Sequence, residues 1–387
     1  MPRLLITSRH LPLYTGGLAS YQKQLAEELS SHHQISVGFL AAEAGLETAH
    51  SPDVLPDPSA TWDALKNRGT WMRLASRPFL HPLLQLWIST CFDRQLKARD
   101  LPVPHPDVIH FVGTGWDFAG FGFHHLARRL GAHFTIWPAV HPGGWGDDAI
   151  DLRLYRLADA VFCQSENEAS HLRMRGLESS KIVRCGLPPM CLPDRDGQDL
   201  RGKLRIGERP VVLFLGRRDE GKGYPALLTA WQKVLVRHPD ALLMLSGPGG
   251  EEYKDLRNRL PAESFRDLGI VDEETKAQAL AACDVFCLPS AHESFGIVFV
   301  EAWSYGKPVI CGPAPASREL VRDGQTGLHA DQNPDSIAEA LDRLLSDAPM
   351  RKSLGNAGLK FQQSALTWDI ISEIHREAFG FRLKNEG

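Results

Sequence analysis

One segment sets the architecture of this protein: DVFCLPSAHESFGIVFVE, residues 284–301. Its first part, residues 284–288, is an apolar run typical of a buried parallel strand. Pro289 ends that strand, and the small and apolar residues that follow predict a helix running toward Gly306. Residues 309–311 form the next short strand. The segment is therefore a strand–loop–helix–strand unit of a parallel sheet.

This unit carries two carboxylates eight positions apart, Glu293 and Glu301. A helix that begins at the carboxyl end of a parallel strand offers free N–H groups and a dipole that favour phosphate. Gly296 lets a ligand approach the backbone. Glu293 can face a ligand's hydroxyls from the loop before the helix, and Glu301, about two turns into the helix, can reach a second hydroxyl pair. A diphosphate with a sugar on each side suits this pattern. The alternative is that neither residue binds a ligand: Glu293 is an ordinary surface residue, and Glu301 has its hydrogen-bond partners within the protein.

The segment resembles the Glu-x7-Glu motif of retaining GT-B glycosyltransferases of the family 4 type (glycosyl transferases group 1). The flanking Gly306-Lys307-Pro308-Val309 and the downstream RELVRDGQTGL, residues 318–328, match the same pattern. The resemblance implies that Glu293 lies near the transferred sugar and Glu301 on the nucleotide ribose. It also implies donor contacts from the residues around the helix start, which are Phe295, Gly296, Ile297 and Val298.

A second loop supplies positive charge. The apolar strand at residues 210–216 is followed by RRDEGKG, residues 217–223. A cation pair in a glycine loop gives a diphosphate charge neutralisation and close backbone approach, although a solvated basic turn is the alternative. The loop is similar to the family's Gly-Arg…Lys-Gly signature, which implies Arg217 and Lys222 as phosphate ligands; Arg218 matches less closely. Ile270 lies in a segment that resembles the one bordering the nucleotide base.

The N-terminal part opens as a Rossmann-like unit, with a strand at residues 4–7, a glycine-containing loop, a helix at 18–29 and a strand at 35–40. It lacks Gly-x-Gly-x-x-Gly, which disfavours a Rossmann dehydrogenase. Gly16 and Gly17 resemble the family's N-terminal glycine loop, which faces the donor phosphates and the acceptor. The alternative is a plain strand-to-helix turn.

His141 follows the strand predicted at residues 133–137, where open α/β sheets place ligands. A histidine there can donate a hydrogen bond or hold charge near neutral pH, but a lone histidine can also be structural. The resemblance implies that His141 lies close to the donor sugar and the acceptor. Residues 185–188 depart from the family's Asn-Gly-Val-Asp, so no nucleotide contact is carried over to them.

Composition narrows the class of protein. A chain of 387 residues predicts two domains, and a net charge of −4 argues against nucleic acid as the main partner. Seven cysteines without metal-type spacing suggest reduced thiols. The apolar part of residues 1–8 is too short for a signal peptide, and no apolar run approaches the ~20 residues of a membrane span. We expect a cytoplasmic protein, soluble or peripheral to the inner face of the cell membrane.

The predicted fold is α/β of the GT-B type: two Rossmann-like domains with parallel sheets facing a central cleft, and a C-terminal helix crossing back to the first domain. The predicted division has an acceptor domain, a linker, a nucleotide-sugar domain and a returning helix, at residues 1–190, 191–208, 209–365 and 366–387. Residues 41–61 predict an irregular loop, and residues 62–99 predict two or three helices. Their apolar side chains belong to the core or face an amphiphilic acceptor or membrane surface.

The predicted function is transfer of a hexosyl unit, with retention, from a UDP- or GDP-sugar to a hydroxyl of a glycan, lipid or small molecule. The predicted catalytic residues are His141, Arg217, Lys222 and Glu293. No Asp-x-Asp pair is placed to hold a metal on the diphosphate, so we expect no metal and no other cofactor. Two alternatives remain: a sugar-nucleotide epimerase or hydrolase of the same fold, and a non-catalytic nucleotide-sugar-binding protein.

Overall fold

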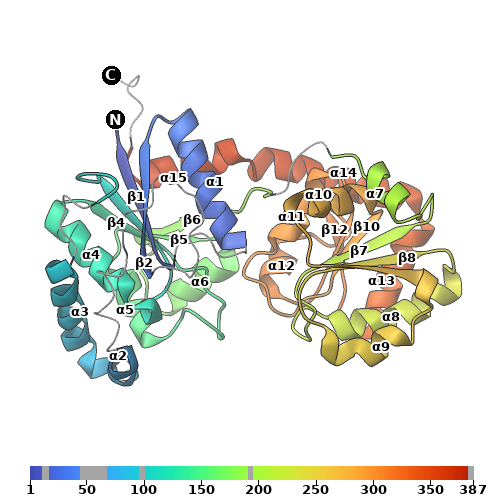
Figure 1. Cartoon of the computed structure of the whole chain (residues 1–387), viewed down its shortest axis with the longest axis horizontal. Helices are drawn as coiled ribbons and strands as arrows, with labels where there is room; N and C mark the ends of the chain where they lie inside the picture. The colour runs from blue at the N-terminus through green and yellow to red at the C-terminus, as the bar shows by residue number, and fades with distance from the viewer. Residues whose placement is uncertain (11–16, 44–67, 96–100, 191–194, 382–387) are drawn as a thin grey trace. The chain divides into compact units, whose positions relative to one another are not determined.

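A computed structural model describes residues 1–10, 17–43, 68–95, 101–190 and 195–381. The chain divides into two compact units, the first formed by Met1–Cys185 with Trp368–Gly387 and the second by Gly186–Thr367 (Figure 1). Each unit contains one six-stranded sheet whose described strand pairs are all parallel. Both sheets are the product of strands alternating with helices, which is the pattern of an α/β protein.

The sheet of the first unit has the order β2-β1-β3-β4-β5-β6. Its strands are β1 (Arg3–His10), β2 (Ser36–Glu43), β3 (Val108–Val112), β4 (His133–Trp137), β5 (Ala160–Cys163) and β6 (Ile182–Arg184). Its helices are α1 (Gly17–His32), α2 (Arg68–Ala75), α3 (His81–Gln95), α4 (Ala119–Leu130), α5 (Ala149–Leu157), α6 (Glu166–Met174) and α15 (Trp368–Ala378), with a short 3₁₀ turn, η3 (Pro78–Leu80). The central strand β3 is buried along its whole length, as in sheets covered on both faces.

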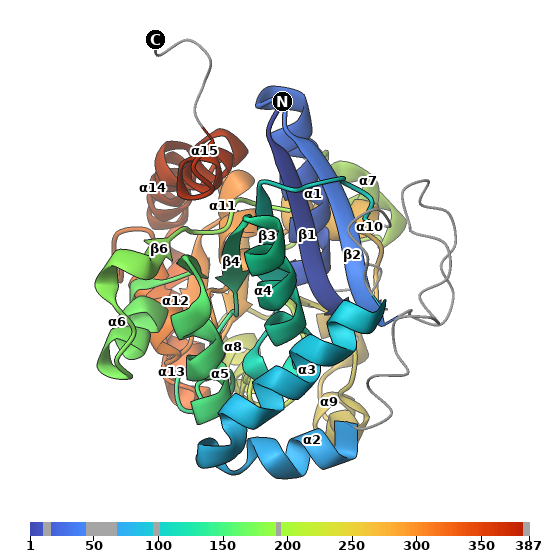
Figure 2. The same cartoon turned by 90° about the vertical axis from the view of Figure 1, so that its left-hand side faces the viewer.

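Helices cover both faces of this sheet. Successive side chains of a strand point to opposite faces. On β3, His110 lies 6.2 Å (ring centroids) from His375 of α15, whereas the next residue, Phe111, lies 5.9 Å from Phe123 of α4. The helices α15 and α4 therefore cover opposite faces. Helix α3 packs on α4 and forms a further layer outside it (Figure 2).

The last described helix, α15, belongs to the first unit although the chain before it belongs to the second. Tyr21 of α1 contacts both Trp368 and His375 of α15. His375 stacks on Phe162 of β5 with ring centroids 4.4 Å apart, and burial lowers the pKa of His375 to about 4. These aromatic contacts hold the helix, and they confirm the expected return of the C-terminal helix to the first domain.

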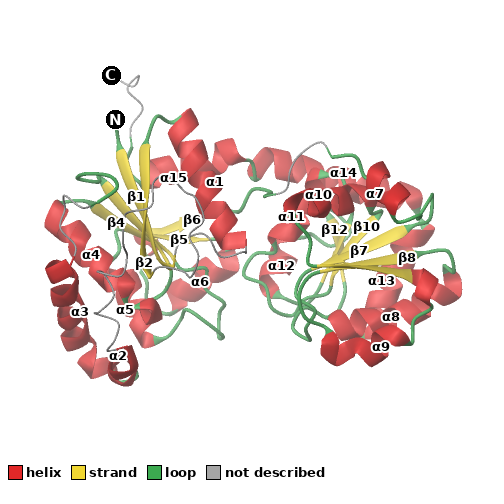
Figure 3. Cartoon of the chain, in the orientation of Figure 1, coloured by secondary structure: helices red, strands yellow, loops and turns green. Residues whose placement is uncertain are grey.

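The sheet of the second unit has the order β12-β11-β10-β7-β8-β9. Helices flank this sheet (Figure 3). Its strands are β7 (Val211–Leu215), β8 (Leu242–Ser246), β9 (Phe265–Gly269), β10 (Val285–Leu288), β11 (Val309–Cys311) and β12 (Gly327–His329). Its helices are α7 (Gln198–Lys203), α8 (Tyr224–Arg237), α9 (Lys254–Asn258), α10 (Glu273–Ala282), α11 (Ile297–Ser304), α12 (Pro315–Leu320), α13 (Pro334–Ser346) and α14 (Ala348–Ala365). The strand–loop–helix–strand unit predicted from residues 284–311 is β10, α11 and β11.

The segment predicted as a linker, residues 191–208, is in part folded onto the second unit. It contains α7, whose Arg201 donates to Asp284 Oδ2 at 2.8 Å and to the carbonyl of Ala282 at 2.9 Å. A Cβ on Gly197 would come within 2.3 Å of the backbone of Ala282, so the two segments are in close contact. The sequence did not predict this helix because the segment is polar and has no apolar run. A few contacts with the rest of the second unit hold the helix in place.

The segment predicted as two or three helices, residues 62–99, contains α2, η3 and α3 in its described part. Residues 44–67 and 96–100 lie outside the described residues, and so does most of the loop predicted at 41–61. Within the described ranges, none of the helices combines the length and the apolar character that crossing a membrane requires.

Candidate active site

The candidate site lies at the carboxyl edge of the second unit's sheet. Strands β7 and β10 are parallel neighbours there, so the loops that follow them leave the sheet at the same edge. The two loops are hydrogen-bonded: the main-chain N–H of Ala291 donates to the carbonyl of Gly221 at 2.9 Å, and Ser290 Oγ donates to the same carbonyl at 3.2 Å. The sheet thereby brings together the glycine loop and the Glu-x7-Glu segment.

Two glycines permit this close approach. Gly223 has a φ of 75°, and a Cβ there would stand 2.4 Å from the carbonyl oxygen of Pro289. Gly296 has a φ of 92° and caps the start of α11, where a Cβ would stand 2.6 Å from the Phe299 ring. A side chain at either position would both clash and strain the backbone, so only glycine fits.

Lys222 and Glu293, two of the predicted catalytic residues, are in direct contact. Lys222 Nζ lies 2.5 Å from Glu293 Oε1 and 3.1 Å from the carbonyl oxygen of His292. The main-chain N–H of Lys222 donates to Asp219 Oδ1 at 2.9 Å, which fixes the loop beneath it. Because an ammonium has three donors, Lys222 can hold both oxygens and still donate once more to a phosphate.

Arg217 and Arg218 are adjacent but have different surroundings. Arg217 is 70% exposed at its side chain and lies 3.3 Å from Asp219 Oδ2. Arg218 is buried and forms a bidentate pair with Asp267, one arm of which measures 2.9 Å. Burial alone would raise the pKa of Asp267, but hydrogen bonds from Arg218 and from the main chain of Gly269 bring it below its usual value. Arg218 therefore joins the loop after β7 to the strand β9. This structural role agrees with its weaker match to a phosphate-binding signature.

Glu301 lies in the second turn of α11 and is only 2% exposed. It is nearer the helix start than predicted because the helix begins at Ile297, after the loop. Its Oε1 lies 3.0 Å from Lys276 Nζ on α10. Burial raises the pKa of Glu301, while Lys276 and a main-chain hydrogen bond from Met190 oppose that rise. The contact with Lys276 stabilises the charged form of the carboxyl group.

Because it contacts Glu301, Lys276 is a candidate site residue, and sequence reasoning missed it. It lies 2.6 Å from Glu273 and 3.0 Å from Glu301, and only 15% of its side chain is exposed. The sequence around it is that of an ordinary polar helix, with no motif or glycine to single it out. Only the tertiary structure, which brings Lys276 within 3.0 Å of Glu301, identifies the pair.

The other residues predicted to contact the nucleotide sugar lie around the start of α11 and after β9. Ile297 and Val298 are the first two residues of α11, where main-chain N–H groups have no partner within the helix. Phe295 is buried, and Ile270, directly after β9, is 78% exposed. Their contacts with a nucleotide sugar stay predictions.

His141 stands in the first unit, on a tight turn after β4. Its main chain exchanges hydrogen bonds with Trp145, each 2.9 Å long. The residue before it, Val140, donates its N–H to Glu168 Oε1 at 2.7 Å, and Ala139 has a φ of 52°. A non-glycine residue at positive φ persists only where the surroundings hold it, and such strain is concentrated at functional sites. Of the glycine loop, Gly17 begins α1, whereas Gly16 lies outside the described residues.

Glu168 is a second residue that the sequence did not reveal. It is fully buried and accepts hydrogen bonds from the main-chain N–H groups of Val140 and Gln164, each 2.7 Å long. Burial raises the pKa of Glu168 to about 8, against the effect of those two donors. One side chain thus ties the end of the β4 loop to the end of β5.

We expect Glu168→Gln to flatten the pH dependence of folding stability. The raised folded-state pKa means that the folded protein binds a proton that the unfolded chain releases, so stability is greatest below the ordinary pKa of 4.5 and falls as pH rises toward about 8. The free energy of unfolding, measured with urea between about pH 5 and about pH 8, should decline in the parent and change less in the variant. Glu178→Gln, at an exposed glutamate, is the control; an equal decline in parent and variant would refute the role of Glu168.

The two six-stranded parallel sheets, each flanked by helices, are the architecture of a GT-B glycosyltransferase. The structure of Anabaena HepE in complex with UDP and glucose is similar over 98% of this chain and 99% of that chain, with a TM-score of 0.68 and 16% sequence identity. At that identity the likeness shows the fold.

The sequence comparisons place the second unit in a family. Residues 196–361 match the family of glycosyl transferases group 1. An uncharacterized glycosyltransferase of Methanocaldococcus jannaschii is 26% identical over 396 residues, covering 95% of each chain. The phosphatidyl-myo-inositol mannosyltransferase of Mycobacterium leprae is 40% identical over 182 residues, which is 46% of this chain and 48% of that protein. This second match thus spans about half of either chain.

Proposed function

We propose that this glycosyltransferase moves a hexosyl unit, with retention of configuration, from a UDP- or GDP-sugar to a hydroxyl of a glycan, lipid or small molecule. The contact between Lys222 and Glu293 beside the start of α11 carries the proposal. It puts a cation for the diphosphate, a carboxylate for the sugar hydroxyls and free helix N–H groups within one ligand's reach. We assign donor binding to the second unit and acceptor binding to the first.

The proposed chemistry uses charge and position. The bond from the sugar's anomeric carbon to the diphosphate breaks as a bond to the acceptor oxygen forms on the same face, and the leaving phosphate takes the acceptor's proton. Arg217, Lys222 and the start of α11 would stabilise the charge that develops on the leaving group. Glu293 positions the sugar, and His141 supplies a hydrogen bond. No covalent nucleophile is assigned.

The proposal requires no metal ion. Among the residues that the structure describes, no three or more His, Cys, Asp or Glu side chains are grouped so as to hold one. The charge on the leaving diphosphate is instead assigned to Arg217 and Lys222.

For the acceptor, a lipid hydroxyl is supported by the similarity to phosphatidyl-myo-inositol mannosyltransferase, which by its name acts on a lipid. We therefore include a peripheral contact with the inner face of the cell membrane in the proposal, for a protein working in the cytoplasm. The match covers about half of that relative, so a glycan or small-molecule acceptor stays within the proposal.

Calorimetric titration with UDP, GDP and ADP tests the donor site. We expect one nucleotide to bind, with an affinity that EDTA does not change, because protein cations and helix N–H groups hold the diphosphate. Arg217→Ala should weaken this binding, whereas Arg237→Ala, at an exposed arginine paired with Asp342, should not. Binding by none of the three nucleotides would contradict the proposed donor site. Sugar release from the donor at full rate without any acceptor would instead identify a hydrolase.

A further inference from the structure

Exposed apolar side chains gather on one surface of the first unit. Half of the large hydrophobic side chains that are exposed in the described ranges lie within residues 72–87. These are Met72 (48% exposed), Phe79 (74%), Leu83 (64%), Leu86 (64%) and Trp87 (37%), on α2, η3 and α3. We call them the α2–α3 surface; the three elements lie at the outside of the unit, beyond α4 and α5 (Figure 2).

The core does not account for this surface. Helix α3 already packs inward through Leu84 and Ile88, which are buried, and through Phe92, whose ring lies 5.4 Å from that of Phe123 on α4. Leu83 and Leu86 are three residues apart and lie on the side away from Leu84 and Ile88, whereas Trp87 lies at the border, 37% exposed and with its ring 5.8 Å from that of the buried Trp71. The helix is thus apolar on both sides, and its outer side faces solvent.

The charged residues between Arg68 and Phe92 have one sign, and the next acid in the chain is Asp93, near the end of α3. Residues 68–92 contain three arginines and no aspartate or glutamate, and two of the arginines, Arg73 and Arg77, are exposed. They flank the exposed Phe79 on its N-terminal side. A helix surface with tryptophan, phenylalanine and leucine beside arginine, and without acids, is typical of segments that lie in the interface of an anionic bilayer.

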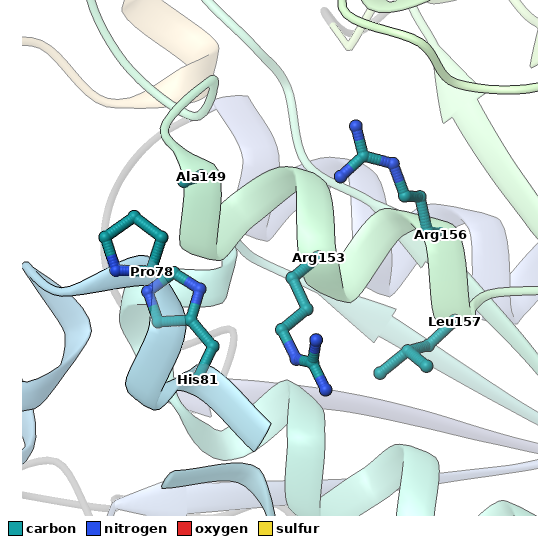
Figure 4. A pocket seen from close by; sticks show the side chains of 6 residues that line it. All are labelled: Pro78, His81, Ala149, Arg153, Arg156 and Leu157. Carbon is teal, nitrogen blue, oxygen red and sulfur yellow. The ribbon is translucent and has the colours of Figure 1, made fainter. Parts of the chain in front are cut away.

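A cationic cavity adjoins the α2–α3 surface. It has a volume of about 300 Å³ and is lined by Pro78, His81, Ala149, Arg153, Arg156 and Leu157 (Figure 4). Arg153 is held by Gln85 of α3, whose Oε1 accepts from Nε at 3.1 Å and from Nη2 at 2.9 Å. Arg156 is exposed and donates to the carbonyl of Arg175.

Two carboxylates at the start of α5 accept hydrogen bonds from Trp116. Asp148, the residue before α5, accepts from Trp116 Nε1 at 2.7 Å, and Asp151 is buried and accepts from the main chain of Trp116 at 3.2 Å. The arginines of the cavity bond to neutral oxygens, Arg153 to Gln85 and Arg156 to the carbonyl of Arg175, so each keeps its positive charge on this side of the unit.

We propose that the α2–α3 surface docks this enzyme on an anionic phospholipid bilayer. Phe79, Leu83 and Leu86 enter the boundary between headgroups and acyl chains, while Arg73 and Arg77 pair with anionic headgroups. The charge distribution selects this occupant, because an apolar surface that has the exposed Arg73 and Arg77 beside it and no acid within residues 68–92 complements a negative surface. The inference rests on the membrane contact included in the proposed function, and it does not depend on which nucleotide sugar is the donor.

Sedimentation of the full-length protein with vesicles tests the proposal. We expect binding to vesicles of phosphatidylcholine mixed with phosphatidylglycerol, and much weaker binding to phosphatidylcholine alone. Arg73→Ser with Arg77→Ser should lower the partition coefficient roughly 30-fold, because each arginine near an anionic surface attracts it independently. Leu83→Ser with Leu86→Ser should lower it roughly tenfold, through lost apolar insertion. High salt should weaken binding by the parent.

A matched control uses exposed apolar residues elsewhere. Met174 and Val236 are 78% and 83% exposed, and Met174→Ser with Val236→Ser should leave vesicle binding unchanged. Nucleotide affinity and thermal stability, measured on every variant, separate this test from that of the donor site. The proposal is overturned if the parent fails to bind anionic vesicles, if both lipid compositions bind equally, or if the control pair loses as much binding as the α2–α3 variants. A parent that dimerises through this surface and ignores vesicles would also overturn it.

Discussion

Lys222→Ala should lower kcat by a factor of about 10²–10³, the effect typical of removing one group that stabilises charge in a transition state. Lys222 lies in the glycine loop after β7 and touches Glu293. Its loss removes a cation from the developing diphosphate and leaves the Glu293 carboxylate, 11% exposed at its side chain, without its ion-pair partner. Steady-state kinetics with the donor identified by titration provide the measurement.

Two variants serve as controls for this result. Lys222→Arg keeps the positive charge but replaces the compact ammonium by a planar guanidinium. It should therefore retain more activity than Lys222→Ala and less than the parent. Lys233→Ala removes an exposed lysine paired with Asp335 in the same unit and should leave the rate unchanged. Parent-like activity in an Arg217→Ala and Lys222→Ala double variant would rule out the phosphate role of both residues.

Glu301→Ala should weaken nucleotide binding by roughly 10- to 100-fold and reduce kcat less, because hydrogen bonds to a charged group contribute about 1.5–3 kcal/mol. In the structure Glu301 is buried and holds Lys276, and the prediction assigns its carboxylate to the ribose hydroxyls. Calorimetric titration with the cognate nucleotide, alongside kcat, separates binding from chemistry.

Glu273→Ala is the matched control for this second result. Glu273 is the other partner of Lys276, at 2.6 Å, and its side chain is 61% exposed. If Glu301 binds ribose, Glu273→Ala should leave nucleotide affinity unchanged. If Glu301 only anchors Lys276, both variants should lose stability and neither should lose affinity, which would refute the ribose role.

Local sequence alone determined the class of fold and the two loops of the candidate site. Apolar runs such as residues 284–288 predict buried parallel strands because both faces of such a sheet are covered. Glycines mark where backbones approach closely, and Gly223 and Gly296 do adopt positive φ next to neighbouring atoms. Charge in a glycine loop is equally visible, so Lys222 could be selected from the sequence.

Tertiary structure decided which charged groups meet. Arg217 and Arg218 are neighbours in sequence, yet one is exposed and the other is buried against Asp267, because the strand β9 brings that aspartate to it. Lys276 and Glu168 carry no local signal of their role, since the partners that distinguish them, Glu301 and Val140, lie 25 and 28 positions away in the chain. The helix α7 escaped prediction for the same reason. Spacing along a chain records local backbone preferences, whereas the pairing of buried charges depends on how helices and strands pack.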